Sequence, residues 1–452
     1  MKNKTFAMLL GVGFGFFGRA SELEPSKAYQ DLWNQPEIVR RIDDGIRTNR
    51  MGDVVLKFTG ADGSILTNVI VQVQQTSHDF LFGANIFMLG GFPTPEENAK
   101  FEQTFTSIFN YATVPFYWSD LEPEPGKLRF AKDSPKIYRR PPPDAVVDFC
   151  QQHGIEMKGH PLVYAQFVPQ WAPKDAAAYW ERVEQHIAEI AGHYRNSIPR
   201  WEVVNESLER DNFPDVALPD DFVFRSLTAA AKVFPTNSIL MLNEATEESW
   251  WWFKGKSSPY YRLIREMLGR GARVDEIGFQ FHVMKYDRWP QLLAGNIFTP
   301  ANIFKVLDQY ADFGHPLAIT EITFPTLPNT PEGERDQATV TRNFYRLWFS
   351  HPSVNAISWW NVVDGTAHGD EVKLNAGLVH RDFSPKPAFT ALDQLINHDW
   401  KTKFQTNSTT SGEILFRGFH GEYTVTAQAG GTTLKQTFHL IKGKTNEWTG
   451  RF

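Results

Sequence analysis

Apolar strand-like runs and helix-like segments alternate along most of the chain. Eight short runs rich in valine, isoleucine and aromatic residues are each followed by a segment with helical spacing. The runs are Phe82–Phe87, Tyr111–Phe116, Ile155–His160, Arg200–Asn205, Ser238–Asn243, Glu276–His282, Leu317–Glu321 and Val354–Trp360. They are apolar on both faces, as in parallel strands whose two faces are both covered. Eight such units predict an α/β fold, a closed (β/α)8 TIM barrel over residues 81–400.

The two ends of the chain predict β-structure outside the barrel. Asp53–Phe58 and Val69–Val73 lie on either side of a turn at 61–63, which predicts a β-hairpin within residues 53–80. Residues 413–452 contain further alternating strands, such as Tyr423–Ala427 and Thr433–Leu440. Because neither segment is large enough for a core of its own, we expect both to form one small accessory β-sandwich. Residues 21–52 are interpreted as a tether, and the Thr-, Ser- and Asn-rich residues 401–412 as a linker.

Residues 1–20 have the features of a secretory signal peptide. Met1–Lys4 is short and basic, Thr5–Gly18 is apolar but too short to span a bilayer comfortably, and small residues precede a cut after Ala20. A secreted or periplasmic protein with no membrane attachment after cleavage is therefore expected. A buried N-terminal helix or a membrane anchor is the alternative interpretation. Cys150 is the single cysteine and cannot form an internal disulfide.

Composition and charge favour a neutral partner. The 452 residues include 46 lysines and arginines against 52 acidic residues, and a net charge of -6 gives no general attraction to nucleic acid or anionic lipid. The 42% hydrophobic residues can fill the core of one large domain. Many of the 14 tryptophans and 36 phenylalanines serve ordinary core packing, but such a composition also suits stacking against sugar rings. A carbohydrate partner is predicted, and nucleic acid is not.

Two of the predicted strands end on a carboxyl group. RWEVVNES places Asn205 and Glu206 at the end of the fourth barrel strand, and PLAITEITFP places Glu321 at the end of the seventh. Active sites of such barrels lie at the carboxyl ends of the strands, and a carboxyl pair is the equipment of a glycosidase. Two glutamates that make salt bridges at the rim are the alternative. Asn205 can bind a sugar hydroxyl beside Glu206 only if the strand curls or bulges at its end.

Further polar residues extend the candidate site. Gln280 and His282 are two apart on one strand and share a face, so they could hold a hydroxyl and orient a nucleophile. His160 ends the third strand, where a structural hydrogen bond is the competing interpretation. Two histidines and two glutamates could also ligate a metal, but the sequence contains no HxH pair and no HExxH spacing. No metal and no other cofactor is predicted.

Longer motifs match one known family. They are WEVVNE at 201–206, GHPLVYAQFVPQW at 159–171, GFQFH at 278–282, ITE at 319–321, WNVVD at 360–364 and SPKPAF at 384–389. From about Asp53 to Phe389 the chain resembles glycoside hydrolase family 10, the (β/α)8 family of endo-β-1,4-xylanases. The resemblance implies that Glu206 is the acid/base and Glu321 the nucleophile. The predicted contacts to the sugar or to its catalytic groups are Asn205, Gln280, His282, His160, Trp171, Trp360 and Tyr164.

Other positions depart from the family pattern. Thr113–Trp118 reads TVPFYW, without the Glu-Asn pair and the lysine that usually hold the non-reducing side of the chain. Tyr164 and Ala165 stand in place of a Trp-His pair, and His368 in place of a tryptophan. These changes predict a more apolar, aromatic glycone pocket, extended by Trp250–Phe253, and therefore a changed sugar, unless other loops supply the missing donors.

The predicted function is a secreted, metal-independent, retaining β-glycoside hydrolase. By resemblance its substrate is a β-linked polysaccharide or oligosaccharide of xylan type, cleaved by double displacement. An exo-acting or non-xylose β-glycosidase of the same family is one alternative, and a catalytically inactive carbohydrate-binding protein is another. The presence of both Glu206 and Glu321 argues against the second, because a lectin needs neither an acid nor a nucleophile. The sugar, the linkage, endo or exo action and the oligomeric state stay open.

Overall fold

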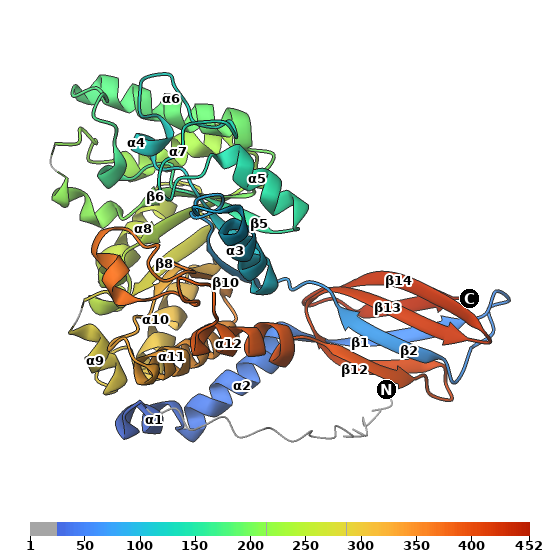
Figure 1. Cartoon of the computed structure of the whole chain (residues 1–452). Helices are drawn as coiled ribbons and strands as arrows, with labels where there is room; N and C mark the ends of the chain where they lie inside the picture. Colours follow the sequence, from blue (N-terminus) through green and yellow to red (C-terminus); the bar gives the residue numbers. More distant parts are fainter. Residues whose placement is uncertain (1–24, 214, 286) are drawn as a thin grey trace.

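The fold has two lobes in the computed structural model, which describes residues 25–213, 215–285 and 287–452. A barrel surrounded by helices forms the larger lobe, and a pair of sheets that contains the C-terminus forms the smaller one (Figure 1). The predicted leader at residues 1–20 lies outside the described residues. No helix in the described part is long and apolar enough to cross a membrane.

Eight parallel strands close into a barrel in the order β10-β3-β4-β5-β6-β7-β8-β9, which confirms the predicted fold class. The strands are β3 Leu81–Asn85, β4 Tyr111–Pro115, β5 Glu156–His160, β6 Arg200–Asn205, β7 Ile239–Glu244, β8 Glu276–His282, β9 Leu317–Thr323 and β10 Val354–Trp359. Nearly every strand position is buried, because side chains fill the barrel on one face and meet the helices on the other.

Helices cover the outside of the barrel. They are α3 Pro95–Ile108, α4 Trp118–Leu121, α5 Pro143–Gln152, α6 Ala176–Tyr194, α7 Phe222–Val233, α8 Pro259–Gly269, α9 Arg288–Leu293, α10 Pro300–Ala311, α11 Pro331–Ser350 and α12 Pro387–Asp393. Short 3₁₀ or π-helical turns are η1 Ala165–Phe167, η2 Ser207–Asn212, η3 Glu247–Trp251, η4 Gly369–Leu374 and η5 Gln394–Asp399. Side-chain caps define several starts: Thr94 and Glu97 form a capping box on α3, and Asp175 caps α6.

The segment interpreted as a tether is instead part of the barrel lobe. Residues 21–52 contain α1 Lys27–Trp33 and α2 Pro36–Arg50, and α2 lies beside α11 (Figure 1). Both helices are amphipathic and bury an apolar face, with Trp33 and Ile42 in the apolar core of the barrel lobe. Arg50 ends α2 and donates to the carbonyls of Phe349, His351 and Val354 at 2.5, 2.5 and 2.6 Å. The tether prediction was wrong because this apolar face was not recognised.

Strands from both ends of the chain form the smaller lobe, as predicted. One sheet has the order β12-β1-β15 and the other β11-β2-β13-β14. The strands are β1 Met51–Thr59, β2 Ile70–Gln75, β11 Lys403–Asn407, β12 Glu413–Phe419, β13 Gly421–Ala429, β14 Thr432–Leu440 and β15 Asn446–Arg451. Alternate side chains of both sheets share one core, which includes Leu56, Val71 and Val425.

Two local predictions in this lobe were wrong. β1 and β2 do not form a hairpin within residues 53–80, because β1 pairs with β12 and β15 whereas β2 pairs with β11 and β13. The connection over residues 60–69 is too long for a tight hairpin turn and passes from one sheet to the other. Residues 401–412 are not only a linker, since they contain β11, whose polar outer face hid its half-buried Phe404.

A matched pair of substitutions tests the shared sandwich core. Val425 in β13 is 1% exposed and Leu415 in β12 is 60% exposed. Because a carboxylate in an apolar core has no partner, Val425→Asp should lower the melting temperature of the sandwich by about 10 °C or more, as a loss of a few kcal/mol does in a small domain. Leu415→Asp should leave it nearly unchanged. Calorimetric melting curves decide, and equal effects of the two substitutions would count against one continuous core.

Candidate active site

A cavity of about 260 Å³ opens at the carboxyl ends of the barrel strands. Its lining comes from the ends of the strands and from the loops that follow them. It comprises Phe87, Tyr117, Arg139, Arg140, His160, Tyr164, Gln166, Phe167, Asn205, Glu206, Gln280, His282, Met284, Glu321, Trp360, His368 and Glu371. Both predicted catalytic glutamates therefore line the same space.

Glu206 directly follows β6 and has a left-handed backbone, with φ 50° and ψ 48°. The pairing of β6 with β7 also slips between Glu202 and Val204. Because of these irregularities, the neighbouring side chains of Asn205 and Glu206 both line the cavity. A regular strand would point them to opposite faces. The carboxylate of Glu206 accepts hydrogen bonds from the Tyr164 hydroxyl at 2.5 Å and from Gln280 Nε2 at 2.8 Å.

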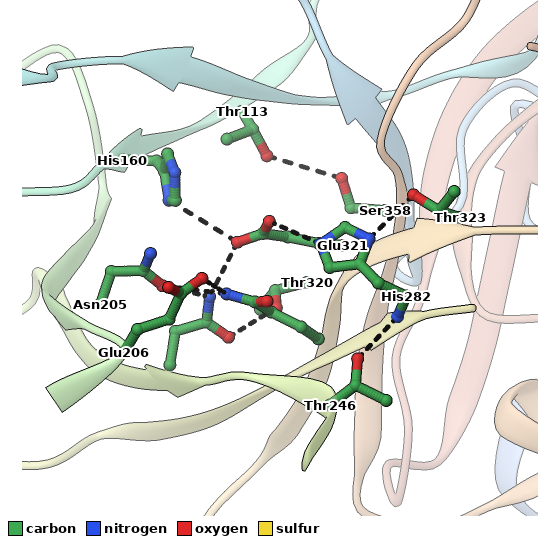
Figure 2. Close-up of polar contacts among 12 residues, drawn as sticks. Thr113, His160, Asn205, Glu206, Thr246, His282, Thr320, Glu321, Thr323 and Ser358 are labelled. Carbon is green, nitrogen blue, oxygen red and sulfur yellow. Dashed lines mark hydrogen bonds and ion pairs between the residues drawn. The ribbon is translucent and has the colours of Figure 1, made fainter. Parts of the chain in front are cut away.

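Glu321 lies near the carboxyl end of β9 and is held on both carboxylate oxygens. Its Oε1 accepts from Asn243 Nδ2 at 2.9 Å, and its Oε2 lies 3.1 Å from His282 Nε2. Figure 2 shows this carboxylate between His282 on one side and His160 on the other. The Nδ1 atom of His160 is 4.0 Å from Oε1 of Glu321. Glu321 is 3% exposed, so its orientation is fixed by these neighbours.

Amide groups connect the two glutamates. Asn243 Nδ2 also donates to Asn205 Oδ1 at 3.0 Å, and Gln280 Nε2 reaches the same Asn205 oxygen at 3.2 Å. Asn243 is fixed in turn by Thr320, whose hydroxyl donates to Asn243 Oδ1 at 2.6 Å. The contacts that link Glu206 to Glu321 therefore run through the amides of Gln280, Asn205 and Asn243. These amides fix the position of one carboxyl group relative to the other.

The tautomer of His282 follows from its partners. Its Nδ1 lies 2.8 Å from the Thr323 hydroxyl, and its backbone N–H donates to Thr246 at 2.7 Å (Figure 2). Burial lowers the pKa of His282, so the ring is neutral near pH 7. A neutral ring with its proton on Nε2 donates to Glu321 and accepts from Thr323, which satisfies both nitrogens.

Beneath Glu321 lies a buried ionic chain. Lys158 pairs with Glu202 at 2.8 Å, and Glu202 accepts from His160 Nδ1 at 2.9 Å. Although burial opposes ionisation, His160 and Lys158 lower the pKa of Glu202 to about 2. Donor atoms of His160, Glu202 and Glu321 lie close enough to hold a metal ion. Lys158, however, already supplies the positive charge that Glu202 requires.

Burial raises the pKa of both cavity glutamates to about 7. Tyr164 and Gln280 oppose this increase at Glu206, whereas the nearby charge of Glu321 adds to it. At Glu321, His160 and Lys158 oppose the effect of burial. The charge of Lys158 favours the ionised form of Glu321, against the effects of burial and of Glu202, and we assign to Glu206 the single proton that the pair holds near neutral pH. One protonated and one ionised carboxyl group is the state that glycoside hydrolysis requires.

The sequence profile of glycosyl hydrolase family 10 matches residues 97–395, more than half of the 452-residue chain. The chain belongs to this family. Among curated relatives, the anti-sigma-I factor RsgI6 of Acetivibrio thermocellus is 25% identical over 422 residues, and the alignment covers 90% of this chain and 49% of that protein. Endo-1,4-beta-xylanase 2 of Arabidopsis thaliana is 24% identical over 405 residues, with 87% of this chain and 34% of the plant protein covered. The chain thus spans half or less of the length of either relative.

Solved structures show the same fold. Xylanase 10B from Thermotoga petrophila, in complex with xylobiose, gives a TM-score of 0.56 at 20% identity, covering 71% of this chain and 95% of that chain. Native xylanase 10B from Thermotoga maritima gives 0.56 at 21% identity, with 71% and 96% covered. Because both identities are below 25%, the two structures support only the fold of this chain, which is the barrel of family 10.

Most of the predicted site residues of this family 10 protein line the cavity, and Trp171 is the exception. Besides the glutamates, the cavity contains Asn205, Gln280, His282, His160, Trp360 and Tyr164. Trp171 instead donates through Nε1 to the carbonyl of Glu122 at 2.9 Å and packs edge-on against Trp118. It follows η1, and both of these contacts are to α4 or to the residue directly after it. A contact between Trp171 and a sugar in this cavity is therefore not supported.

The expectation of a mainly apolar pocket requires correction. Tyr117 and Tyr164 do line the cavity, but Trp250 packs on Phe279 and Phe281 outside its lining. Sequence reasoning missed Arg139 and Arg140, which a loop between α4 and α5 places in the wall. Other loops thus supply donors in place of the missing lysine.

Other missed residues had recognisable patterns. Lys158 is two positions before His160 on β5 and shares its face, so strand alternation could have found it. Asn243 is the next-to-last residue of β7, in the sequence LMLNE, which resembles the VVNE at the end of β6.

The hydrogen bond from Gln280 to Glu206 predicts a shift in pH dependence. The amide stabilises the ionised carboxylate and so lowers its pKa, and Gln280→Leu should raise that pKa. Since the acid must carry its proton, the alkaline limb of kcat/KM should lie near pH 7 in the wild type and move upward by about one pH unit in the variant. Initial-rate pH profiles measure this. A limb that stays in place or moves to lower pH contradicts the assignment of Glu206.

Proposed function

We propose that this protein is a retaining β-glycoside hydrolase that acts on a xylan-type β-glycan. One observation carries the proposal: the buried Glu321 and the half-buried Glu206, held by different partners, face one cavity at the barrel mouth. Family membership and the xylanases among its relatives support the substrate class. A binding protein without activity would not need one carboxyl group that holds a proton beside a second one that is ionised.

In the first step Glu321 acts as the nucleophile. Its ionised carboxylate attacks the anomeric carbon and forms a glycosyl–enzyme ester, while the bond to the leaving oxygen breaks. Glu206 donates its proton to that oxygen, so the aglycone leaves as a neutral alcohol. Asn243 and His282 hold Glu321 from either oxygen, which fixes the direction of attack.

In the second step Glu206 acts as a general base instead of a general acid. The resulting Glu206 carboxylate removes a proton from a water molecule, and the oxygen of that water attacks the anomeric carbon. The ester bond to Glu321 breaks and the sugar departs with its original β configuration. Because Glu206 accepts from Tyr164 and Gln280, its ionised form is stabilised between the two steps.

Export to the periplasm or the medium is part of the proposal. The basic start and apolar stretch within residues 1–20 support it, and so does a polymeric substrate that lies outside the cell. Expression of the full chain followed by N-terminal sequencing of the exported protein tests this. The expected new N-terminus is Ser21, and a protein retained with residues 1–20 attached would argue against export.

Release of reducing ends from β-1,4-xylo-oligosaccharides tests the proposed activity. The wild-type protein should cleave them catalytically, and Glu321→Gln should bind them without cleavage. Binding without cleavage by the wild type would favour the carbohydrate-binding alternative. Absence of both binding and cleavage would remove xylan-type glycans from the proposal.

A further inference from the structure

Two consecutive arginines form part of the cavity wall. Arg139 and Arg140 lie in the loop that leads to α5, and they are 3% and 8% exposed. Arg139 has a left-handed backbone with φ 59°. A strained backbone at a buried charged residue is costly, and such costs concentrate where a side chain has a function.

The guanidinium of Arg139 is incompletely paired within the described part of the protein. Nη1 donates to the carbonyl of Thr366 at 2.6 Å, but Nε is buried without a hydrogen-bond partner. Among the described residues, no carboxylate forms an ion pair with Arg139 within 4.0 Å, whereas Arg140 pairs with Asp120 at 2.8 Å. Burial lowers the pKa of Arg139, and the charge of Glu371, which also lines the cavity, opposes this effect from beyond ion-pair distance. The Glu371 carboxylate itself accepts a hydrogen bond from Asn361 at 3.1 Å.

Arg50 provides the comparison for a buried structural arginine. Arg50 donates to three carbonyls, and none of its nitrogens is among the unpartnered buried atoms of the described chain. Arg139 satisfies one nitrogen and leaves another without a partner. A buried donor without a partner is unfavourable, and so Arg139 is suited to a ligand that accepts a hydrogen bond there and adds negative charge beside the guanidinium.

The space around the arginines is large enough for a sugar substituent. A second cavity of about 630 Å³ shares Phe87, Arg139 and Arg140 with the active-site cavity. Its lining also contains Lys132 and Lys136. Lys132 pairs with Asp148 and Arg140 with Asp120, whereas Arg139 has no such ion pair within the described chain. The guanidinium carbon of Arg140 lies 3.8 Å from the centre of the Tyr117 ring, which fixes its plane.

We propose that Arg139, with Arg140 beside it, binds the carboxylate of a uronic acid carried by the glycan. The planar fork of an arginine matches a carboxylate by two parallel hydrogen bonds. Arg139 contacts Thr366 and Phe87, which follow β10 and β3, and both arginines follow β4, whereas Glu206 follows β6, two strands beyond β4. Since Glu206 must reach the leaving oxygen, the uronate lies on the glycone side. This inference rests on the proposed glycosidase function and narrows its substrate.

Calorimetric binding to the full-length Glu321→Gln protein tests the inference without hydrolysis. One ligand pair is a xylo-oligosaccharide with a glucuronic acid branch and the same compound after its carboxyl group has been reduced. The other pair is 4-nitrophenyl β-glucuronide and 4-nitrophenyl β-glucoside, in which the uronate is the glycone itself. In at least one pair the carboxylate compound should bind about tenfold or more tightly, as expected for a charge-assisted hydrogen bond.

Substitutions assign the preference to Arg139. In Arg139→Gln the carboxylate and reduced compounds should bind with nearly equal affinity, whereas Arg265→Gln, an exposed change on α8, should keep the wild-type ratio. Two results obtained with Arg139 in place would overturn the inference. They are equal affinities within both ligand pairs, and no binding of any of the four ligands. Both results can be obtained even if Arg139→Gln fails to fold. Hydrolysis of neutral xylo-oligosaccharides by the wild type is measured separately, so the proposed activity can stand when the uronate preference fails.

Discussion

Replacing Glu321 with glutamine should lower kcat by on the order of 10⁴-fold or more, because an amide cannot attack the anomeric carbon. The substitution keeps the shape of the side chain, so Asn243 and its neighbours should stay in place. Steady-state rates on an activated aryl β-glycoside, which needs no acid assistance, measure the loss. The loss should be equally large on poor leaving groups, because ester formation fails in both cases.

A matched control separates this effect from general damage. Glu181 is an exposed glutamate on α6 that does not line the cavity, and Glu181→Gln should leave kcat unchanged. If Glu321→Gln retained more than about a tenth of the wild-type kcat, a difference of barely 1.4 kcal/mol in the barrier, Glu321 could not be the nucleophile.

Glu206→Ala should produce a loss that depends on the leaving group. On glycosides with poor leaving groups the rate should fall by about 10² to 10⁴-fold, the usual contribution of a general acid. On a dinitrophenyl glycoside, whose leaving group needs no proton, formation of the glycosyl–enzyme should be nearly preserved. Pre-steady-state release of dinitrophenol measures this first step directly.

Azide distinguishes the roles of the two glutamates. In Glu206→Ala, azide should attack the glycosyl–enzyme and give a β-glycosyl azide, because the Glu321 ester is still formed. In Glu321→Ala, azide should take the place of the missing nucleophile and give the α product. The same anomeric product from both variants would show that the assignment of acid and nucleophile is wrong.

The barrel and its catalytic pair were predictable because their signals are local in the sequence. Each buried strand is a continuous apolar run, and Glu206 and Glu321 stand where such runs end. The left-handed backbone of Glu206 was not visible in the sequence, although the need for an irregular strand end was. The position of the site could be predicted from the strand ends because a parallel barrel brings all of these ends to one mouth.

What remained hidden depends on partners that are distant in sequence. β1 and β2 look like a hairpin in isolation, and only the strands of the last forty or so residues determine that they belong to different sheets. Arg139 lies in a loop without periodicity, so its position in the cavity wall could not be derived from a pattern. Its unpaired charge is a property of the folded surroundings alone.

The configuration of the first sugar released from the wild-type protein tests the central claim most directly. Proton NMR spectra, recorded within the first minutes of hydrolysis of xylo-oligosaccharides with and without a glucuronic acid branch, resolve the α and β anomeric signals before they equilibrate. Double displacement at Glu321 with proton transfer by Glu206 predicts that the β signal appears first and the α signal follows only by mutarotation. If the α signal appears first, the reaction inverts the anomeric centre and the account is contradicted.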